Sequence, residues 1–409
     1  MSEVMTHRVA VIGTGADPDE RTREGFAMAY RHAPGYRHLD SCELVACADI
    51  VPEHAAAFAE SFDVPGVYTD HARMLEVENP DIVSICVPPG AHAELVVDCA
   101  EADSVRAVHC EKPMATTWGD CQTMVRRCNE QNTQLTIDHQ RRFARPVQQA
   151  KRLLEEDTIG RLQRLEWSEA NLFDGGSHLF DLCDYFLDGE RPRWALAGVE
   201  THPDNRWFGA LNEVQAVAQW EYRDGTQGFA STAEGDRQTL VDAYLRLVGE
   251  DGVIEIQADE GVPLRVRTSG DWEDVDTGGE SVYGPGRSRL REVKAKVSSV
   301  VPGLEAPDSP ASHYERAIAH LVTSLEEGTE PIISGRRVLR GTELVFACWE
   351  SARTRGRVDL PLDITDNPLE ELCAEPDGES AEHTDRHDER TDREADPAHR
   401  RQSSTEQHG

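Results

Sequence analysis

Residues 9–15 read Val-Ala-Val-Ile-Gly-Thr-Gly, a continuous apolar run that ends in a glycine-containing turn. Four apolar residues in succession are typical of a parallel strand buried on both faces. Gly13 permits a tight turn, and Gly15 lets the backbone approach a pyrophosphate beside the N-terminus of the next helix. The segment therefore predicts a dinucleotide site that includes Gly13, Thr14 and Gly15. Pro18 stands where a third glycine is usual.

A second apolar strand, residues 44–48, ends at Asp49. A carboxylate at this position can accept hydrogen bonds from both hydroxyls of an adenosine ribose, and it would repel a 2′-phosphate. We therefore expect NAD as the cofactor, with NADP as the alternative. Asp49 lies farther from the glycines than the usual interval of about 20 residues, which indicates an insertion in the first crossover.

Further along the chain, the pattern of strands and helices changes once. Their alternation up to residue 143 predicts an α/β fold, in which residues 1–143 form a doubly wound parallel Rossmann sheet. Beyond it, Asp-Gly turns at 224–225 and 251–252 lie between alternating runs, which is a hairpin signal. Residues 144–365 are therefore expected to form an α+β domain with a mostly antiparallel open sheet. The acidic segment 366–409 is predicted to be a disordered tail.

Composition restricts the kinds of partner. The chain has 409 residues, with 76 acidic and 42 basic side chains and a formal net charge of -34. We expect no nucleic-acid partner, because a phosphate backbone requires a surface rich in Lys and Arg. A membrane partner is not expected for the same reason. An acid-rich, lysine-poor chain is typical of salt-loving cells, where salt screens the self-repulsion, so we expect a halophilic protein.

Cysteine usage and hydropathy indicate the compartment. The ten cysteines include no CxxC pair, which is typical of reduced, mostly buried thiols in a cytosolic protein. Residues 1–8 contain no apolar leader segment, and no run of about 18 apolar residues occurs, as a membrane span would require. These observations predict a cytoplasmic protein.

Two further motifs, read together with the glycine turn, resemble a known family. Glu-Lys-Pro at 111–113 follows the fifth predicted strand, and Asp-Gly-Gly-Ser-His at 174–178 opens the second domain. With Ser-Ile-Cys-Val-Pro-Pro-Gly-Ala-His at 84–92, residues 8–362 resemble the glucose–fructose oxidoreductase / inositol dehydrogenase / rhizopine-catabolism family (Gfo/Idh/MocA). The resemblance implies NAD(P)-dependent hydride transfer at a hydroxyl or carbonyl of a sugar, cyclic polyol or related small molecule.

The resemblance also implies catalytic roles for Lys112, Asp174 and His178, which in that family surround the reacting carbon. Histidine suits the base that removes a hydroxyl proton, because its unperturbed pKa of about 6.5 lies close to working pH. A lysine ammonium beside the oxygen would stabilise developing alkoxide charge. One helical turn would place Asp174 and His178 on the same side, where both would contact the substrate. The family also implies a cis peptide between Lys112 and Pro113.

Other positions are assigned by the same resemblance. Pro88, His92, Glu111 and Lys112 are expected beside the cofactor, although His92 could instead begin a helix. Arg142 is expected to contact the substrate, with a structural salt bridge as the alternative for it and its neighbour Arg141. We expect no metal site. Family members also lead us to expect a homo-oligomer, a dimer or tetramer, in which the open sheet packs against a copy of itself.

Two other functions stay open. Some relatives with this fold bind a nucleotide and regulate a partner without catalysis. The presence of Lys112, Asp174 and His178 argues against such a role, because a sensor does not need a proton-transfer set. A hydrolase or lyase that uses transient oxidation with tightly held NAD is hardly separable from a dehydrogenase at this stage.

Overall fold

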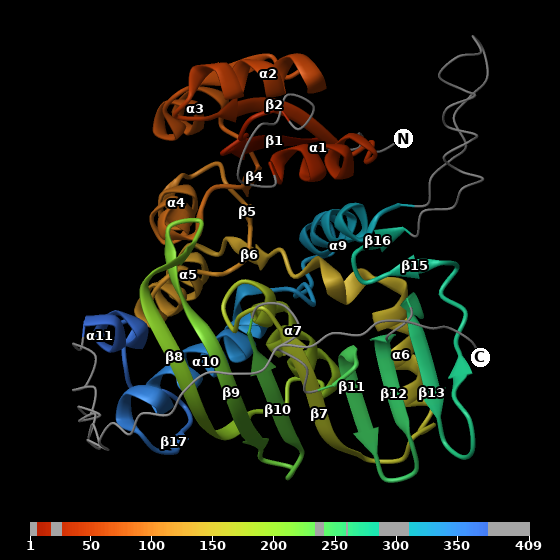
Figure 1. Ribbon diagram of the computed structural model, residues 1–409. Coiled ribbons are helices and arrows are strands. Elements are labelled where there is room, and N and C mark those ends of the chain that lie inside the picture. Colours follow the sequence, from red (N-terminus) through yellow and green to blue (C-terminus); the bar gives the residue numbers. More distant parts are fainter. Residues whose placement is uncertain (1–5, 18–26, 234–240, 259–260, 286–310, 375–409) are drawn as a thin grey trace, which may run out of the picture. The chain divides into compact units, whose positions relative to one another are not determined.

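The computed structural model describes five segments of the chain: residues 6–17, 27–233, 241–258, 261–285 and 311–374 (Figure 1). The predicted departure at Pro18 lies outside the described residues. All of the described segments belong to one compact unit, which ends at Ala374. Two separate β-sheets organise this unit.

The first sheet has six parallel strands in the order β3-β2-β1-β4-β5-β6. The strands are β1 (His7–Ile12), β2 (Cys42–Ala48), β3 (Gly66–Tyr68), β4 (Ile82–Ile85), β5 (Ala107–Cys110) and β6 (Gln134–Ile137). In β1, Val9 and Val11 pack in one apolar core while Ala10 and Ile12 pack in another, because successive side chains of a strand point to opposite faces. This strand order confirms the predicted Rossmann sheet.

Helices cover both faces of the first sheet. They are α1 (Ala29–Arg37), α2 (Pro52–Phe62), α3 (His71–Glu78), α4 (His92–Glu101), α5 (Trp118–Gln131) and α9 (His313–Glu327). Helix α9 comes from far along the chain, yet its Ile318 and Leu321 share a core with Val9 and Val11 of β1. A helix from the second half of the sequence therefore completes the layer that α1 and α2 begin.

The second sheet has nine strands in the order β14-β13-β12-β11-β7-β10-β9-β8-β17 (Figure 1). Their bounds are β7 (Leu162–Glu169), β8 (Pro192–Trp207), β9 (Ala210–Tyr222), β10 (Gln227–Thr232), β11 (Ala243–Gly249), β12 (Val253–Ala258), β13 (Leu264–Arg267), β14 (Glu273–Asp274) and β17 (Val358–Asp359). All neighbours pair antiparallel except β7 and β10. The predicted mostly antiparallel sheet is thus confirmed. A separate small ribbon joins β15 (Glu280–Ser281) to β16 (Gly284–Pro285).

Further helices and turns connect and cover the two sheets. They are η1 (Pro89–Ala91), η2 (Gln140–Phe143), α6 (Arg145–Glu155), α7 (Gly175–Phe186) and α10 (Gly335–Thr354). Helices α7 and α10 pack on each other and on strands β7 and β8. None of the described helices is both long and apolar enough to cross a membrane.

The first residues that were assigned to the predicted tail include a helix. Residues 366–374 were assigned to it, but helix α11 (Pro368–Ala374) packs against α10 and β8. Leu369 of this helix is fully buried, and Asn367 donates a side-chain hydrogen bond to the Thr116 carbonyl at 3.0 Å. Apolar residues within the acidic run are therefore sufficient to anchor one more helix. Residues 375–409 lie outside the described residues.

Candidate active site

Gly13 and Gly15 shape the turn that follows β1. Their φ angles are 82° and 68°, a region that residues with a side chain rarely adopt. A Cβ atom on Gly13 would lie 2.4 Å from Val87 Cγ1. Asp49, just after β2, accepts hydrogen bonds from the backbone N–H groups of Thr14 and Gly15, both at 2.9 Å. The structure thus brings the four predicted residues together, and a bare backbone turn beside a carboxylate fits an adenine dinucleotide.

Lys112 and Asp174 join the two predicted motifs. Lys112 Nζ lies 2.6 Å from Asp174 Oδ1, and each side chain is 17% exposed. The peptide bond between Lys112 and Pro113 is cis, as expected. Asn171 Oδ1 accepts hydrogen bonds from the backbone N–H groups of Asp174 and Gly175, at 2.6 and 3.1 Å, which fixes the start of α7. The carboxyl edge of the first sheet therefore meets the N-terminal end of α7.

His178 lies in the first turn of α7 and is buried. Its Nδ1 is 3.3 Å from Nδ1 of His139, a residue just after β6 that sequence analysis did not single out. Burial, together with the positive charges of Arg141 and Lys112, holds the pKa of His178 well below its ordinary value. The imidazole is therefore neutral at neutral pH and can accept a proton. Lys112 contacts Asp174, which lies one helical turn before His178 on α7.

Comparison with protein families agrees with this geometry. Residues 7–139 match the profile described as "Oxidoreductase family, NAD-binding Rossmann fold", and residues 136–360 match "Oxidoreductase family, C-terminal alpha/beta domain". The chain belongs to the Gfo/Idh/MocA oxidoreductase family. Its first sheet is accordingly an NAD-binding Rossmann domain.

Similar proteins are found among characterised Gfo/Idh/MocA sequences and structures. A D-apiose dehydrogenase from Paraburkholderia graminis is 25% identical over 80% of this chain and 86% of that protein. A myo-inositol 2-dehydrogenase from Thermotoga maritima is 30% identical over 54% of this chain and 66% of that protein. An oxidoreductase from Agrobacterium radiobacter, crystallised with NAD+, L-tartaric acid and magnesium, has a TM-score of 0.65 at 20% identity, covering 87% of this chain and 98% of that one.

Two residues of this Gfo/Idh/MocA chain that were expected beside the cofactor point into the protein. His92 is fully buried at the start of α4, and its ring nitrogens lie 2.9 Å from the carbonyl oxygens of Val87 and Pro113. Glu111 Oε1 lies 3.1 Å from a buried histidine of α1. The expectation of direct cofactor contact is therefore corrected for both side chains, because they brace the turns after β4 and β5. Pro88 follows Val87 and is exposed.

Arg142 takes the salt-bridge alternative instead of contacting a substrate. It is 1% exposed, and its Nη2 lies 2.6 Å from Asp181 Oδ1 and 3.1 Å from Asp184 Oδ2. Its Nη1 donates to the Ile332 carbonyl at 2.9 Å. A guanidinium buried this deeply requires such pairing, so the predicted substrate contact is corrected. The neighbouring Arg141 lies instead over two tyrosine rings, near His178.

Glu213 in β9 is a buried carboxyl that sequence analysis did not single out. Its Oε1 accepts a hydrogen bond from the Leu172 backbone N–H at 2.5 Å, and its Oε2 accepts one from Trp349 Nε1 at 3.1 Å. Burial raises the pKa of Glu213 to about 7. Because Leu172 lies just before Asp174 in the chain, Glu213 positions the segment that carries Asp174. Its signal in the sequence is weak, since acidic residues are common throughout this chain.

Proposed function

We propose that this chain is an NAD-dependent dehydrogenase that oxidises a hydroxyl, or reduces the corresponding carbonyl, of a sugar, cyclic polyol or related small molecule. The proposal is supported by one observation: Lys112, at the end of β5, pairs with Asp174 at the start of α7, the helix whose first turn carries His178. The relatives named as D-apiose and myo-inositol dehydrogenases support this substrate class.

Each of the three side chains has a distinct task. Neutral His178 accepts the proton of the substrate hydroxyl, since its low pKa keeps the imidazole unprotonated. The ammonium of Lys112 stabilises the negative charge that develops on the same oxygen. Asp174 holds Lys112 in place and presents a carboxylate to a second substrate hydroxyl, which favours a polyhydroxylated molecule. NAD, when bound, accepts hydride from the carbon that carries the hydroxyl.

The cofactor would lie along the carboxyl edge of the first sheet. Gly13, Thr14 and Gly15 would face its pyrophosphate, and Asp49 its adenosine ribose. Pro88 would lie at the nicotinamide end, near Lys112. A 2′-phosphate would approach the carboxylate of Asp49, and we therefore propose that NAD is preferred over NADP.

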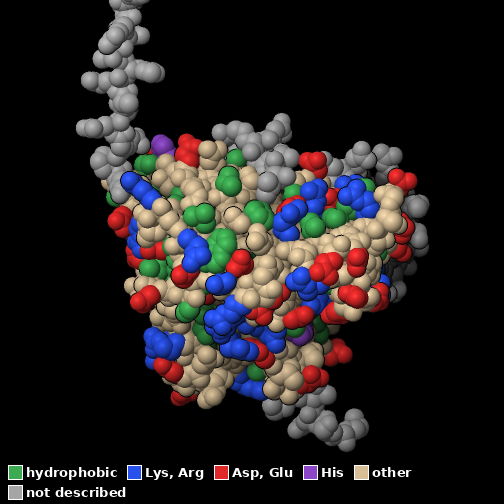
Figure 2. Space-filling model, turned by 90° about the horizontal axis from the view of Figure 1, so that it is seen from below, with side chains coloured by type: hydrophobic (Ala, Val, Ile, Leu, Met, Phe, Trp, Pro, Cys, Tyr) green, Lys and Arg blue, Asp and Glu red, His purple; other side chains and the backbone are tan. Residues whose placement is uncertain are grey.

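The surroundings of the site favour a soluble, self-associating enzyme. Val217 of β9 and Leu196 of β8 are 68% and 43% exposed, so we propose that this part of the second sheet packs against another copy, as a dimer or tetramer. All ten cysteines are free thiols, seven of them buried, which supports a cytoplasmic location. Acidic side chains are interspersed with Arg over the surface seen in Figure 2, and the net charge of -34 supports adaptation to high salt.

The decisive experiment follows the near-ultraviolet absorbance of reduced nicotinamide. The full chain is mixed with NAD and a panel of cyclic polyols, aldoses and sugar acids, at high and at low salt. We expect a steady absorbance increase with at least one compound and its loss in Lys112→Met. The matched control is Lys151→Met, because Lys151 of α6 forms a similar 2.6 Å pair with Asp188, which follows the C-terminal end of α7.

The same experiment separates the alternatives. If a compound is turned over without a net absorbance change, the chain is a hydrolase or lyase that oxidises its substrate transiently, and the assignment as a dehydrogenase is wrong. Binding of NAD and sugar without turnover of any kind would leave a non-catalytic regulator. Product analysis by chromatography, run alongside the absorbance measurement, distinguishes these two outcomes.

A further inference from the structure

A polar cluster lies under α1 at the carboxyl ends of β4, β5 and β6. On this face of the first sheet, Ile82 and Ala107 belong to the apolar core shared with α1 and α9. Two residues further along the same strands, Ser84 and His109 replace the apolar side chains. Because side chains alternate between the faces of a strand, these polar groups continue the same layer. They are fully buried.

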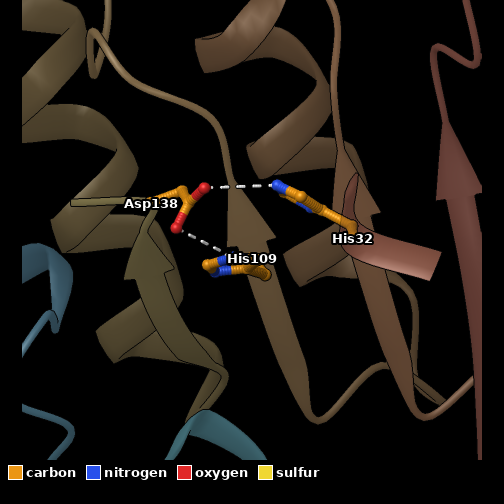
Figure 3. Close-up of side chains that lie close together, drawn as sticks. All are labelled: His32, His109 and Asp138. Atoms are coloured by element: carbon orange, nitrogen blue, oxygen red, sulfur yellow. Dashed lines mark hydrogen bonds and ion pairs between the residues drawn. The ribbon is translucent and has the colours of Figure 1, made fainter. Parts of the chain in front are cut away.

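Three side chains from separate elements meet in this layer (Figure 3). They are His32 of α1, His109 of β5 and Asp138 directly after β6, and none is more than 1% exposed. His32 Nε2 lies 3.3 Å from Asp138 Oδ2, and His109 Nε2 lies 3.6 Å from Asp138 Oδ1. Glu111 adds a fourth group, its Oε1 being 3.1 Å from His32 Nε2. Two imidazoles and the carboxylate of Asp138 therefore converge, and the carboxylate of Glu111 lies beside His32.

The hydrogen bonds around His109 are consistent with a proton on Nδ1. Its Nδ1 lies 2.9 Å from Thr136 Oγ1, and that hydroxyl donates to the Val108 carbonyl at 3.2 Å. A hydroxyl that donates its one proton elsewhere can only accept from the imidazole. Nδ1 is therefore the donor, and Nε2 presents a lone pair to the carboxylate of Asp138.

Two buried acceptors thus face each other. Neither His109 Nε2 nor Asp138 Oδ1 has a hydrogen-bond partner among the described residues. Buried polar atoms nearly always have a partner, because burying one without compensation costs free energy. A lone pair and a carboxylate oxygen that point at the same place are both satisfied by a cation between them.

We propose that His32, His109 and Asp138 bind one divalent transition-metal ion beside the carboxylate of Glu111, with zinc as the best fit. The His32 and His109 Nε2 atoms lie 3.3 and 3.6 Å from the two carboxylate oxygens of Asp138, and the ligand atoms of the three residues all lie within 4.8 Å of one another. A tetrahedral zinc site with bonds of about 2.0–2.1 Å has edges of about 3.3 Å. The two carboxylates balance the charge of the ion. This site departs from the sequence-based expectation that the chain holds no metal.

The second nitrogen of each imidazole supports the assignment. His32 Nδ1 lies 3.1 Å from Ser84 Oγ, and His109 Nδ1 lies 2.9 Å from Thr136 Oγ1. Histidine ligands of metals usually hold their other ring nitrogen in such a hydrogen bond, which fixes the tautomer and the ring orientation. Both histidines therefore direct Nε2 toward Asp138.

The site is structural and separate from the proposed catalytic one. Glu111 and Lys112 are neighbours at the end of β5, yet Glu111 points to His32 while Lys112 points to Asp174. The ion would brace the strand end that carries Lys112 without touching the substrate. The proposal does not depend on the dehydrogenase activity.

Metal analysis of the full chain tests this site. The chain and His109→Gln are purified without chelators, equilibrated with zinc, passed through a desalting column and analysed by mass spectrometry of the metal. We expect about one zinc per chain in the first and a loss of at least about tenfold in the variant. His71→Gln is the matched control, because His71 pairs with Asp98 at 2.9 Å on a more exposed surface. Histidines of the tail are the same in all three proteins.

Cobalt spectroscopy of the unmutated chain tests the metal site even if His109→Gln fails to fold. In the unmutated chain, Co²⁺ should give the intense visible bands of four-coordinate geometry, and added zinc should abolish them. Zinc should also raise the Tm of the unmutated chain. Two results would overturn the proposal. One is an equal zinc content in the unmutated chain and His109→Gln, and the other is an unmutated chain that retains no zinc and shows no four-coordinate cobalt bands. A proton on His32 would then bridge the two carboxylates in place of a metal.

Discussion

Lys112 and Asp174 are 62 positions apart in the chain and form an ion pair with an Nζ–Oδ1 distance of 2.6 Å. The pair connects the end of β5 in the parallel sheet to the start of α7, which packs on the second sheet. His178 lies one helical turn beyond Asp174 on α7. We propose that this arrangement directs an ammonium, a carboxylate and a neutral imidazole to one substrate position, as alcohol oxidation requires.

Replacing the proposed base tests its role directly. His178→Gln keeps a side chain of similar size but cannot accept a proton, so we expect kcat to fall by about 10²- to 10⁴-fold. Steady-state kinetics measures the change, and circular dichroism checks that the fold is intact. His71→Gln should retain full activity. A variant within a few-fold of the unmutated enzyme would remove His178 from the mechanism.

The glycine turn should not tolerate a side chain. Gly13→Ala would place a methyl group 2.4 Å from Val87 Cγ1 at a φ of 82°, and we expect the Kd for NAD to rise at least about tenfold, with a stability loss of about 1–3 kcal/mol. Gly209→Ala is the control, since Gly209 has a φ of 81° but open space around its Cβ. Calorimetric titration with NAD measures the affinity, which would be unchanged if the turn did not face the cofactor.

Asp49 should set the choice between the two nicotinamide cofactors. Asp49→Asn keeps an acceptor for the N–H groups of Thr14 and Gly15 but removes the charge that would repel a 2′-phosphate. We expect the preference for NAD over NADP, measured as a ratio of Kd values, to fall by about tenfold or more. A ratio that stays constant would mean that Asp49 only supports the turn.

Removal of the Arg142 guanidinium should affect stability and not substrate binding. Arg142→Met leaves the carboxylates of Asp181 and Asp184 with less compensation, and we expect a loss of about 3–5 kcal/mol in the free energy of unfolding. Chemical denaturation measures it. Arg126→Met, which breaks an exposed pair with Glu130, should cost less than about 1 kcal/mol. If Arg142→Met instead raised KM and left the stability unchanged, the result would support the original prediction that Arg142 contacts the substrate.

The buried carboxyl of Glu213 makes stability depend on pH. Burial raises its pKa from 4.5 to about 7, so between these values the folded chain binds more protons than the unfolded chain. The resulting stability is complete below about pH 4.5 and is lost as the pH rises through about 7, by at most about 1.4 kcal/mol per pH unit.

Glu213→Gln removes this titration. The free energy of unfolding of the variant minus that of the unmutated chain should therefore increase between pH 4.5 and 7. Denaturation at a series of pH values and constant ionic strength measures the difference, in which contributions from the histidines cancel. A difference independent of pH would show that Glu213 ionises normally.

Sequence patterns predicted those features that depend on neighbouring residues. The apolar run of β1, its glycine turn and the Asp-Gly hairpins were recognisable because strand alternation and turn chemistry act over a few positions. The helix of residues 368–374 was missed, because acidic composition outweighed two or three apolar side chains. The roles of Lys112, Asp174 and His178 came from the order of motifs and stay predictions, and the structure adds the contact between Lys112 and Asp174.

By itself the sequence determined the two-sheet architecture, the family and the cofactor class, since each follows from short stretches of chain. Only the tertiary structure decided where the long-range partners lie. Arg142 was equally suited to a substrate or to a salt bridge until Asp181 and Asp184 were found against it. His32, His109 and Asp138 belong to three separate elements, and nothing in their spacing relates them. Their convergence depends on strand pairing and helix packing, which local patterns do not encode.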